Sequence, residues 1–222
     1  MCKKIILTSC PIFVKYCVII SSQTFYLWIM VNSEIKILAT TLLSENWGKL
    51  SKVTYEQVLP NGKTITDTRE VYNRGNGAAI LLYHIEKKSV ILTRQFRLPT
   101  WYNGNADGMM IEACAGLLDE KDPEECIRCE TEEETGYTLS AIEKVMEVYM
   151  SPGSVTEILY FFIAAYDEKM KTGEGGGLDE EQENIEVLEL PFNESLSMIK
   201  NGKIKDAKTI ILLQYLRLNN IL

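Results

Sequence analysis

The sequence predicts a mixed α/β domain from about Glu45 onward, and three observations carry this prediction. Short β-rich stretches alternate with turn-forming residues along most of the chain. Two segments begin with a helix-capping acid, and one of them repeats apolar residues at helical spacing. The composition, 46% hydrophobic and 24% charged over 222 residues, suffices for one domain with a sizeable core, or for one domain with a small appendage.

Residues 1–31 differ from the rest, because they are strongly apolar and nearly free of acids. A membrane-spanning helix needs about 20 mostly apolar residues, but Pro11, Lys15 and the polar run 21–24 interrupt this one. A secretory signal would need a small-residue cleavage site, and none follows. We therefore expect an apolar leader over 1–31 that is untranslated or disordered, with translation starting at Met30. A membrane anchor is the competing interpretation.

The β-rich stretches suggest two regions after this leader. We expect an N-terminal β region over residues 32–75 and the main domain over residues 76–222. Turn chemistry separates several strands, since proline, asparagine and glycine gather at 60–62, 75–77 and 151–153. The expected strands are 49–58, 64–72, 79–85, 90–96, 110–115, 142–149, 156–166 and 185–190.

Helices are expected at three places. Asp122 is a good N-cap and Pro123 suits the first helical position, so a helix should run from there to near Gly136. A second helix should begin after Asp206, and a shorter one should span 193–200. Residues 173–183 combine glycines with acids, which predicts a mobile anionic loop.

Charge and the counts of histidine and cysteine exclude several classes of function. The net charge of −8 argues against a nucleic-acid binder or a binder of anionic membranes, because phosphates require a basic footprint. His84 is the one histidine of the sequence, so a histidine-based triad or multi-histidine metal site is nearly excluded. The six cysteines have no spacing typical of a disulfide framework or zinc site, which favours reduced thiols in a cytoplasmic protein.

An acidic run in the helix expected after Asp122 is the main chemical signal. Glu130, Glu133 and Glu134 share one helical face, since neighbours at i, i+3 and i+4 line up. A solvated acidic face is the commonest meaning of such a run. Here, however, the helix follows an apolar stretch that should turn sharply at Gly116, which would aim the carboxylates at one point. Oxygen ligands of this kind suit Mg²⁺ together with a phosphorylated substrate.

The segment 116–137 resembles the Nudix box, the signature of the Nudix hydrolase family. Its closing part matches at Glu130, Glu133, Glu134, Gly136 and Tyr137. The similarity continues at 69–77, 94–97, 150–157 and 185–192, which look like the nucleotide-sugar branch of the family.

The segment departs from the family pattern in three ways. It is one residue shorter, so that Asp122 stands near the first glutamate of the pattern. Cys129 occupies the arginine position, and Thr131 stands where an apolar residue is usual. The missing arginine changes how the charge around the site is balanced, but the carboxylates that would bind the metal are all present.

The resemblance implies a Nudix-type α/β/α sandwich with a mixed sheet, preceded by a small N-terminal β region. It also implies Mg²⁺-dependent hydrolysis of the diphosphate bond of a nucleoside diphosphate sugar, first of all GDP-mannose to GMP and mannose 1-phosphate. ADP-ribose or an ADP-sugar is the alternative substrate. A non-catalytic nucleotide-binding Nudix sensor is a remote alternative, because the ligand glutamates are present. Relatives of this kind are homodimers in which the N-terminal strands reach across to the site of the neighbouring subunit, so the resemblance implies a homodimer. We expect a cytoplasmic location.

Carried over by position, the resemblance also assigns roles to residues. The acid of the anionic loop is expected at Glu183, two residues before Ile185, with Glu180 and Glu181 as alternatives. The implied metal ligands are the carbonyl of Ala115, Glu130, Glu134 and Glu183, and the implied catalytic residues are Glu183, Glu134 and Glu133. The implied substrate-binding residues are Trp47, Thr68, Arg69, Glu70, Arg97, Ala115, Gly116, Leu117, Glu157, Gln182, Glu183 and Lys208.

Overall fold

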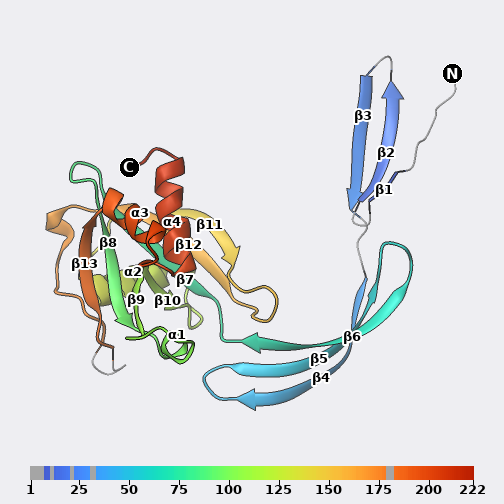
Figure 1. Ribbon diagram of the computed structural model, residues 1–222, viewed down its shortest axis with the longest axis horizontal. Coiled ribbons are helices and arrows are strands. Elements are labelled where there is room, and N and C mark those ends of the chain that lie inside the picture. Colours follow the sequence, from blue (N-terminus) through green and yellow to red (C-terminus); the bar gives the residue numbers. More distant parts are fainter. Residues whose placement is uncertain (1–7, 11–12, 21–22, 31–33, 179–182) are drawn as a thin grey trace. The chain divides into compact units, whose positions relative to one another are not determined.

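A computed structural model describes residues 8–10, 13–20, 23–30, 34–178 and 183–222 of the chain. The chain divides into two compact units, Met1–Tyr72 and Asn73–Leu222 (Figure 1). Residues 1–7, 11–12, 21–22 and 31 of the expected leader lie outside the described residues. The start of translation at Met30 stays a prediction. Among the described residues, no helix combines the length and the apolar character needed to cross a membrane.

The first unit contains β strands only, among the residues described. One antiparallel sheet has the order β1 (Thr8–Cys10), β2 (Phe13–Ile20) and β3 (Gln23–Met30). A second sheet has the order β4 (Ile35–Glu45), β5 (Lys49–Val58) and β6 (Thr64–Asn73). Gly62 takes a φ of +80° in the turn between β5 and β6, a conformation that glycine adopts without strain. The N-terminal β region of the expected fold class is therefore confirmed.

The second unit is built on a mixed sheet. Within its described residues the strand order is β11–β12–β7–β8–β13, with β10 paired to β7 and β9 paired to β8. Strands β12 and β7 run parallel, whereas the other pairs are antiparallel. The strands are β7 (Gly77–His84), β8 (Ser89–Phe96), β9 (Met109–Glu112), β10 (Cys114–Leu117), β11 (Glu143–Tyr149), β12 (Ile158–Ala165) and β13 (Glu186–Pro191).

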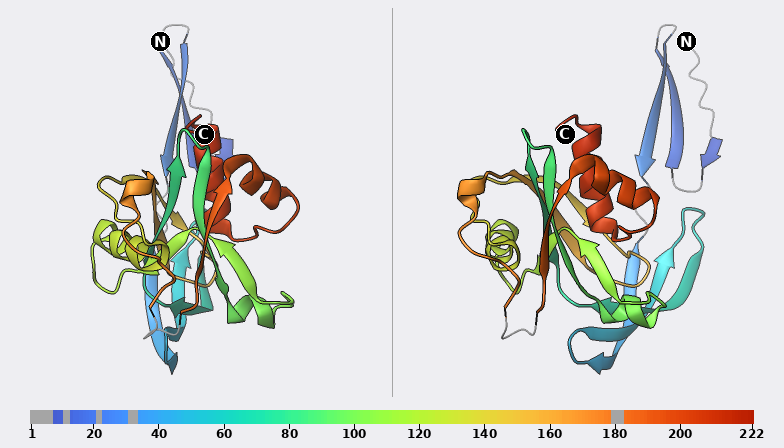
Figure 2. Two further views of the ribbon diagram at one scale, coloured as in Figure 1. Left: turned by 90° about the vertical axis from the view of Figure 1, so that its left-hand side faces the viewer. Right: turned by 60° about the vertical axis from the view of Figure 1, so that its left-hand side comes forward.

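Helices cover both faces of this sheet, which gives the expected α/β/α sandwich. Helix α2 (Pro123–Thr135) lies on one face, and α3 (Phe192–Lys200) and α4 (Ala207–Leu218) lie on the other (Figure 2, right). Alternate residues of β7 separate the two cores, since Ile80 and Ile127 of α2 belong to one cluster while Leu81 and Leu213 of α4 belong to the other. A short helix α1 (Leu98–Tyr102) and a 3₁₀ turn η1 (Glu168–Met170) complete the described elements.

The single strand expected over 110–115 is wrong, because the structure divides this stretch in two. Strand β9 pairs with β8, and β10 pairs with the neighbouring strand β7, so the chain changes partner at Ala113. The amide N–H of Ala113 donates to the side-chain hydroxyl of Thr209 in α4 at 2.6 Å. This crossing point lies beside the start of α4, and β10 itself packs against α2.

Candidate active site

Helix α2 carries Glu130, Glu133 and Glu134 of the candidate site. The side chain of Asp122 accepts a hydrogen bond from the amide of Glu124 at 2.9 Å, which caps the N-terminus as the sequence predicts. Gly136 ends the helix with a φ of +77°. A Cβ at Gly136 would lie 2.2 Å from the carbonyl oxygen of Gly173, so the loop that contains Gly173 packs directly against the end of the helix.

The three glutamates of α2 have different surroundings. Glu134 is buried, Glu130 is partly buried, and Glu133 is exposed. Glu134 and Glu130 lie one turn apart toward the sheet, where the helix contacts β10 and β7. The structure therefore brings Glu130 and Glu134 together with β10, and it places the Glu133 side chain in solvent.

Glu134 is the most unusual carboxylate of the described residues. It is 2% exposed, and its Oε2 atom is buried without a hydrogen-bond partner among them. Burial raises the pKa of Glu134 to about 8, helped by the charges of Glu130 and Glu183 and opposed by a hydrogen bond from Cys114 and by Arg97. An unpartnered buried carboxylate oxygen among like charges is costly unless a cation balances it.

Glu130 lies directly against the backbone of β10. A Cβ at Gly116 would stand 2.1 Å from Oε1 of Glu130, so only glycine leaves room for the carboxylate there. Residues Ala115 and Gly116 pair with Ala79 and Ala78 of β7, which fixes this segment in the sheet. The turn at Gly116 that the sequence suggests is thus a strand position that receives a side chain from the helix.

The described residues on either side of Glu183 are tied to the end of α2 by backbone hydrogen bonds. The amide of Gly176 donates to the carbonyl of Glu134 at 2.9 Å, and the amide of Ile185 donates to the carbonyl of Gly176 at 3.1 Å. The Oε2 atom of Glu183 accepts from the amide of Leu178 at 3.4 Å. Its charge contributes to the raised pKa of Glu134.

Gln182, together with the alternatives Glu180 and Glu181, lies outside the described residues.

The oxygen atoms gathered here fit a divalent cation. Within the described ranges, no three histidine, cysteine, aspartate or glutamate side chains already stand close enough to form a closed metal cage. The buried, unpartnered oxygen of Glu134 is a hard, anionic donor of the type that Mg²⁺ and similar ions prefer, and the charges of Glu130 and Glu183 act on the same carboxylate. The carboxylate of Glu130 lies beside the backbone at Gly116.

A second charged cluster, which the sequence did not reveal, lies at the end of β9. Glu112 is 5% exposed, and its two carboxylate oxygens accept from Nε of Arg97 at 2.7 Å and from Nζ of Lys208 at 2.6 Å. Burial acts to raise the pKa of Glu112, but the charges of Lys208 and Arg97 outweigh it, so the pKa lies below its ordinary value. A single buried carboxylate therefore holds two of the cations expected to bind substrate. The sequence signal that could have identified Glu112 is its position as the one acid within the apolar stretch 110–115.

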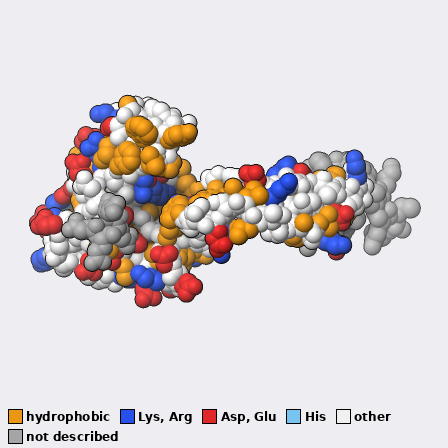
Figure 3. Space-filling model, turned by 90° about the horizontal axis from the view of Figure 1, so that it is seen from below, with side chains coloured by type: hydrophobic (Ala, Val, Ile, Leu, Met, Phe, Trp, Pro, Cys, Tyr) orange, Lys and Arg blue, Asp and Glu red, His pale blue; other side chains and the backbone are white. Residues whose placement is uncertain are grey.

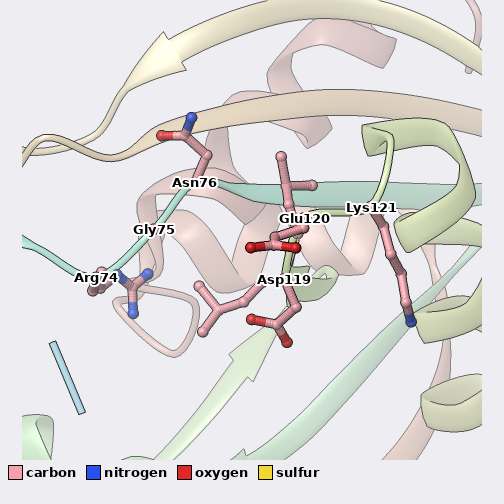
Figure 4. Close-up of a pocket in the computed structure, with 8 residues that line it drawn as sticks. Arg74, Gly75, Asn76, Asp119, Glu120 and Lys121 are labelled. Carbon is pink, nitrogen blue, oxygen red and sulfur yellow. The ribbon is translucent and has the colours of Figure 1, made fainter. Parts of the chain in front are cut away.

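Glu157 also lies in a buried ion pair. It is 5% exposed and bonds the guanidinium of Arg74. Arg74 lines a cavity of about 390 Å³ in which Asp119 and Glu120 stand between Arg74 and Lys121 in the view of Figure 4. The full lining is Arg74, Gly75, Asn76, Leu117, Leu118, Asp119, Glu120 and Lys121, which includes Leu117 of the predicted substrate-binding set.

The remaining predicted residues belong to the first unit. Trp47 is 68% exposed in the turn between β4 and β5. On β6, the hydroxyl of Thr68 lies 3.0 Å from that of Thr54, Arg69 forms an ion pair with Asp67 at 2.6 Å, and Glu70 is exposed.

Comparison with known proteins agrees with this division of the chain. A family model described as the NUDIX domain matches residues 73–212, and one described as the GDP-mannose pyrophosphatase NudK N-terminal domain matches residues 34–72.

Three similar proteins all carry the name GDP-mannose pyrophosphatase. That of Cronobacter sakazakii is 54% identical over 188 residues, covering 85% of this chain and 97% of its own. That of Klebsiella pneumoniae is 52% identical over 188 residues, covering 85% and 94%, and that of Salmonella arizonae is 51% identical over 192 residues, covering 86% and 100%. With a matching domain across most of the second unit and relatives this similar, the chain belongs to the Nudix hydrolase family.

Proposed function

We propose that this protein hydrolyses the diphosphate bond of GDP-mannose to GMP and mannose 1-phosphate, with Mg²⁺ as its cofactor. The observation that carries this proposal is the carboxylate of Glu134, which is buried with an unpartnered oxygen and feels the charges of Glu130 and Glu183. Such an arrangement suits a site that gathers a cation around a diphosphate. The similar proteins from three bacteria, each named GDP-mannose pyrophosphatase, support the choice of substrate.

The residues that would hold Mg²⁺ are the carbonyl of Ala115 and the carboxylates of Glu130, Glu134 and Glu183. A bound divalent cation neutralises the diphosphate and activates water for attack on phosphorus. Glu130 is set by its contact with Gly116, and Glu134 by burial between α2 and β10. The fold would thus hold two of these carboxylates in place before the substrate arrives.

Proton transfer is assigned to an acid at the edge of this donor set. Glu183 is half-buried on the loop between η1 and β13, where it would take a proton from the attacking water. Glu134 keeps a raised pKa in the metal-free protein, so its proton must leave before it binds a cation. Glu133 is the weakest of the three catalytic candidates, because its side chain is exposed.

Recognition of the nucleotide sugar is divided between the two units in this proposal. In the second unit, Arg97 and Lys208 would contact the phosphates, Gly116 and Leu117 would contact the substrate through their backbone, and Glu157 would contact the sugar side. In the first unit, Trp47 would stack on guanine and Thr68, Arg69 and Glu70 would contact the nucleotide, in the site of the other subunit of a homodimer. Gln182 completes the proposed set.

A homodimer is part of the same proposal. The first unit exposes large apolar side chains on β4, including Ile37 at 57% and Leu42 at 52%, and Figure 3 shows hydrophobic side chains along this unit. Apolar surface of this kind marks protein interfaces. Light scattering should therefore give a dimer for the wild type and a monomer for the I37K/L42K variant, whereas a monomeric wild type would refute this part. A cytoplasmic location stays a prediction.

The experiment that tests the function is a panel of nucleotide sugars with Mg²⁺ or with a chelator. The products from GDP-mannose and ADP-ribose are separated by chromatography. GMP and mannose 1-phosphate should form from GDP-mannose only when Mg²⁺ is present, with little product from ADP-ribose. Turnover of ADP-ribose with none of GDP-mannose would refute the proposed substrate, and turnover in chelator would refute the role of the cation.

A further inference from the structure

Glu112 joins two cations that come from distant parts of the chain. Arg97 follows the end of β8, and Lys208 lies in the first turn of α4, 96 positions beyond Glu112. Each cation occupies a different oxygen of the carboxylate, at 2.7 Å and 2.6 Å. Because both side-chain oxygens are used, the positions of the two cations are fixed relative to each other.

The cluster is rigid on the helix side as well. Nζ of Lys208 lies 3.1 Å from Oδ1 of Asp206, whose other oxygen accepts from the amide and the hydroxyl of Thr209 at the start of α4. The same hydroxyl accepts the bond from Ala113 at the crossing between β9 and β10. The ion pairs are therefore tied to the strand that carries the backbone of the candidate metal site.

The geometry leaves donors of Arg97 for another partner. Glu112 accepts from Nε, so the two Nη groups on the outer edge of the guanidinium take no part in this bond. Arg97 also acts to lower the pKa of Glu134, so its charge reaches the acidic donor set. A planar guanidinium held at one edge presents its other donors in a fixed direction, which suits a phosphate.

We propose that Glu112 is a positioning residue for the diphosphate: it fixes Arg97 and Lys208 so that both present their remaining N–H groups to the same diphosphate. The inference rests on the proposed function, because it takes the diphosphate to bind beside Glu130 and Glu134. Glu112 itself contacts no substrate. A buried ion-pair cluster with only a structural purpose would support folding and leave the affinity of the folded protein for a diphosphate unchanged.

The test replaces Glu112 in the full chain. E112Q keeps the shape of the side chain and removes the charge, and E112D keeps the charge and shortens the reach. Calorimetry with methylenediphosphonate and Mg²⁺ measures diphosphate binding without turnover, and steady-state kinetics with GDP-mannose gives KM and kcat. Both variants should bind methylenediphosphonate about 10-fold more weakly or worse, with KM raised more than kcat is lowered. E112D supplies the result if E112Q does not fold.

Two comparisons make the outcome specific. The control E189Q removes a carboxylate that bonds Ser89 and Tyr166 at the opposite end of β8, and its affinity should equal that of the wild type. In the R97A/K208A background, adding E112Q should weaken binding no further, since Glu112 acts only through these cations.

Each contrary result has a distinct meaning. Folded E112Q or E112D that binds methylenediphosphonate like the wild type would overturn the inference. So would an E112Q change that costs as much affinity in the R97A/K208A background as in the wild type. Failure of the wild type to bind methylenediphosphonate would overturn it as well. If the wild type binds methylenediphosphonate but leaves GDP-mannose intact, the proposed function fails while the role of Glu112 in diphosphate binding is still decided by the affinities.

Discussion

The carboxylate of Glu130 occupies the space that a side chain at Gly116 would need. A Cβ there would lie 2.1 Å from Oε1 and from Cδ of Glu130, far inside van der Waals contact. Strand β10 and helix α2 are thereby fitted to each other at the position where the metal ligands are proposed. The absence of a side chain at residue 116 is therefore a requirement of the site.

Replacing Gly116 by alanine should damage the metal site more than the fold. The new methyl group would push aside the flexible end of Glu130, so we expect the affinity for Mg²⁺ to fall about 10- to 100-fold with little change in melting temperature. Activity measured against Mg²⁺ concentration gives the affinity. The matched control is G153A, whose Cβ would meet nothing within 4 Å and which should behave like the wild type. Unchanged Mg²⁺ dependence in G116A would contradict the placement of Glu130.

Replacing Glu134 by glutamine should abolish turnover and spare the fold. Glutamine has nearly the same shape but cannot supply an anionic ligand, so we expect kcat/KM for GDP-mannose to fall at least about 100-fold. E133Q is the comparison, since Glu133 is exposed on the same helix. Its kcat/KM for GDP-mannose should fall much less. Far-ultraviolet circular dichroism checks that both variants fold. Turnover by E134Q close to that of the wild type would mean that the site lies elsewhere.

The stability of the metal-free protein should fall as the pH rises from 4.5 to about 8. Burial and neighbouring acids raise the pKa of Glu134 from 4.5 to about 8, so in this range the folded protein keeps a proton that the unfolded chain has lost. The resulting loss is up to about 1.4 kcal/mol per pH unit. Chemical denaturation at several pH values in chelator should show this slope in the wild type relative to E134Q. Parallel profiles for the two proteins would argue against the buried carboxylate.

The ion pairs of Glu112 predict that stability depends on pH in the opposite direction in the acidic range. Because Lys208 and Arg97 hold its pKa below the ordinary 4.5, the ionised form stabilises the folded state above that pH. This stabilisation is lost as the pH falls below 4.5 toward the pKa of the folded state. The difference in unfolding free energy between the wild type and E112Q should therefore shrink in acid. A difference independent of pH would show that Glu112 is not held as an ion.

Most of the second unit could be predicted from the sequence because local signals and tertiary packing agree there. Asp122 and Pro123 mark the start of α2, and the apolar residues after Asp206 mark α4. The break at Ala113 could not be predicted, since no turn residue marks it and its cause is a hydrogen bond to Thr209, 96 positions away. Strand β4 and helix α1 were missed for a related reason: both leave large apolar side chains exposed, so no pattern of burial distinguishes them.

The candidate site, like the fold, could be predicted from the sequence only in part. The family pattern identifies Glu130 and Glu134, because the spacing of one helix turn is local. Spacing does not show that Glu134 is buried while Glu133 is in solvent, since this depends on where β10 packs. Glu112 could not be found, because its meaning depends on Arg97 and Lys208, which meet only in the folded protein.

A crystal structure with Mn²⁺ and a GDP-mannose analogue that carries a methylene group between the phosphorus atoms tests the central claim most directly. Anomalous scattering locates the ion independently of the protein atoms. We predict an ion bound by the carboxylates of Glu130 and Glu134 and the carbonyl of Ala115, with the diphosphate between the ion and Arg97. An ion and diphosphate bound elsewhere, with Glu134 still buried and unpartnered, would contradict the assignment of this site.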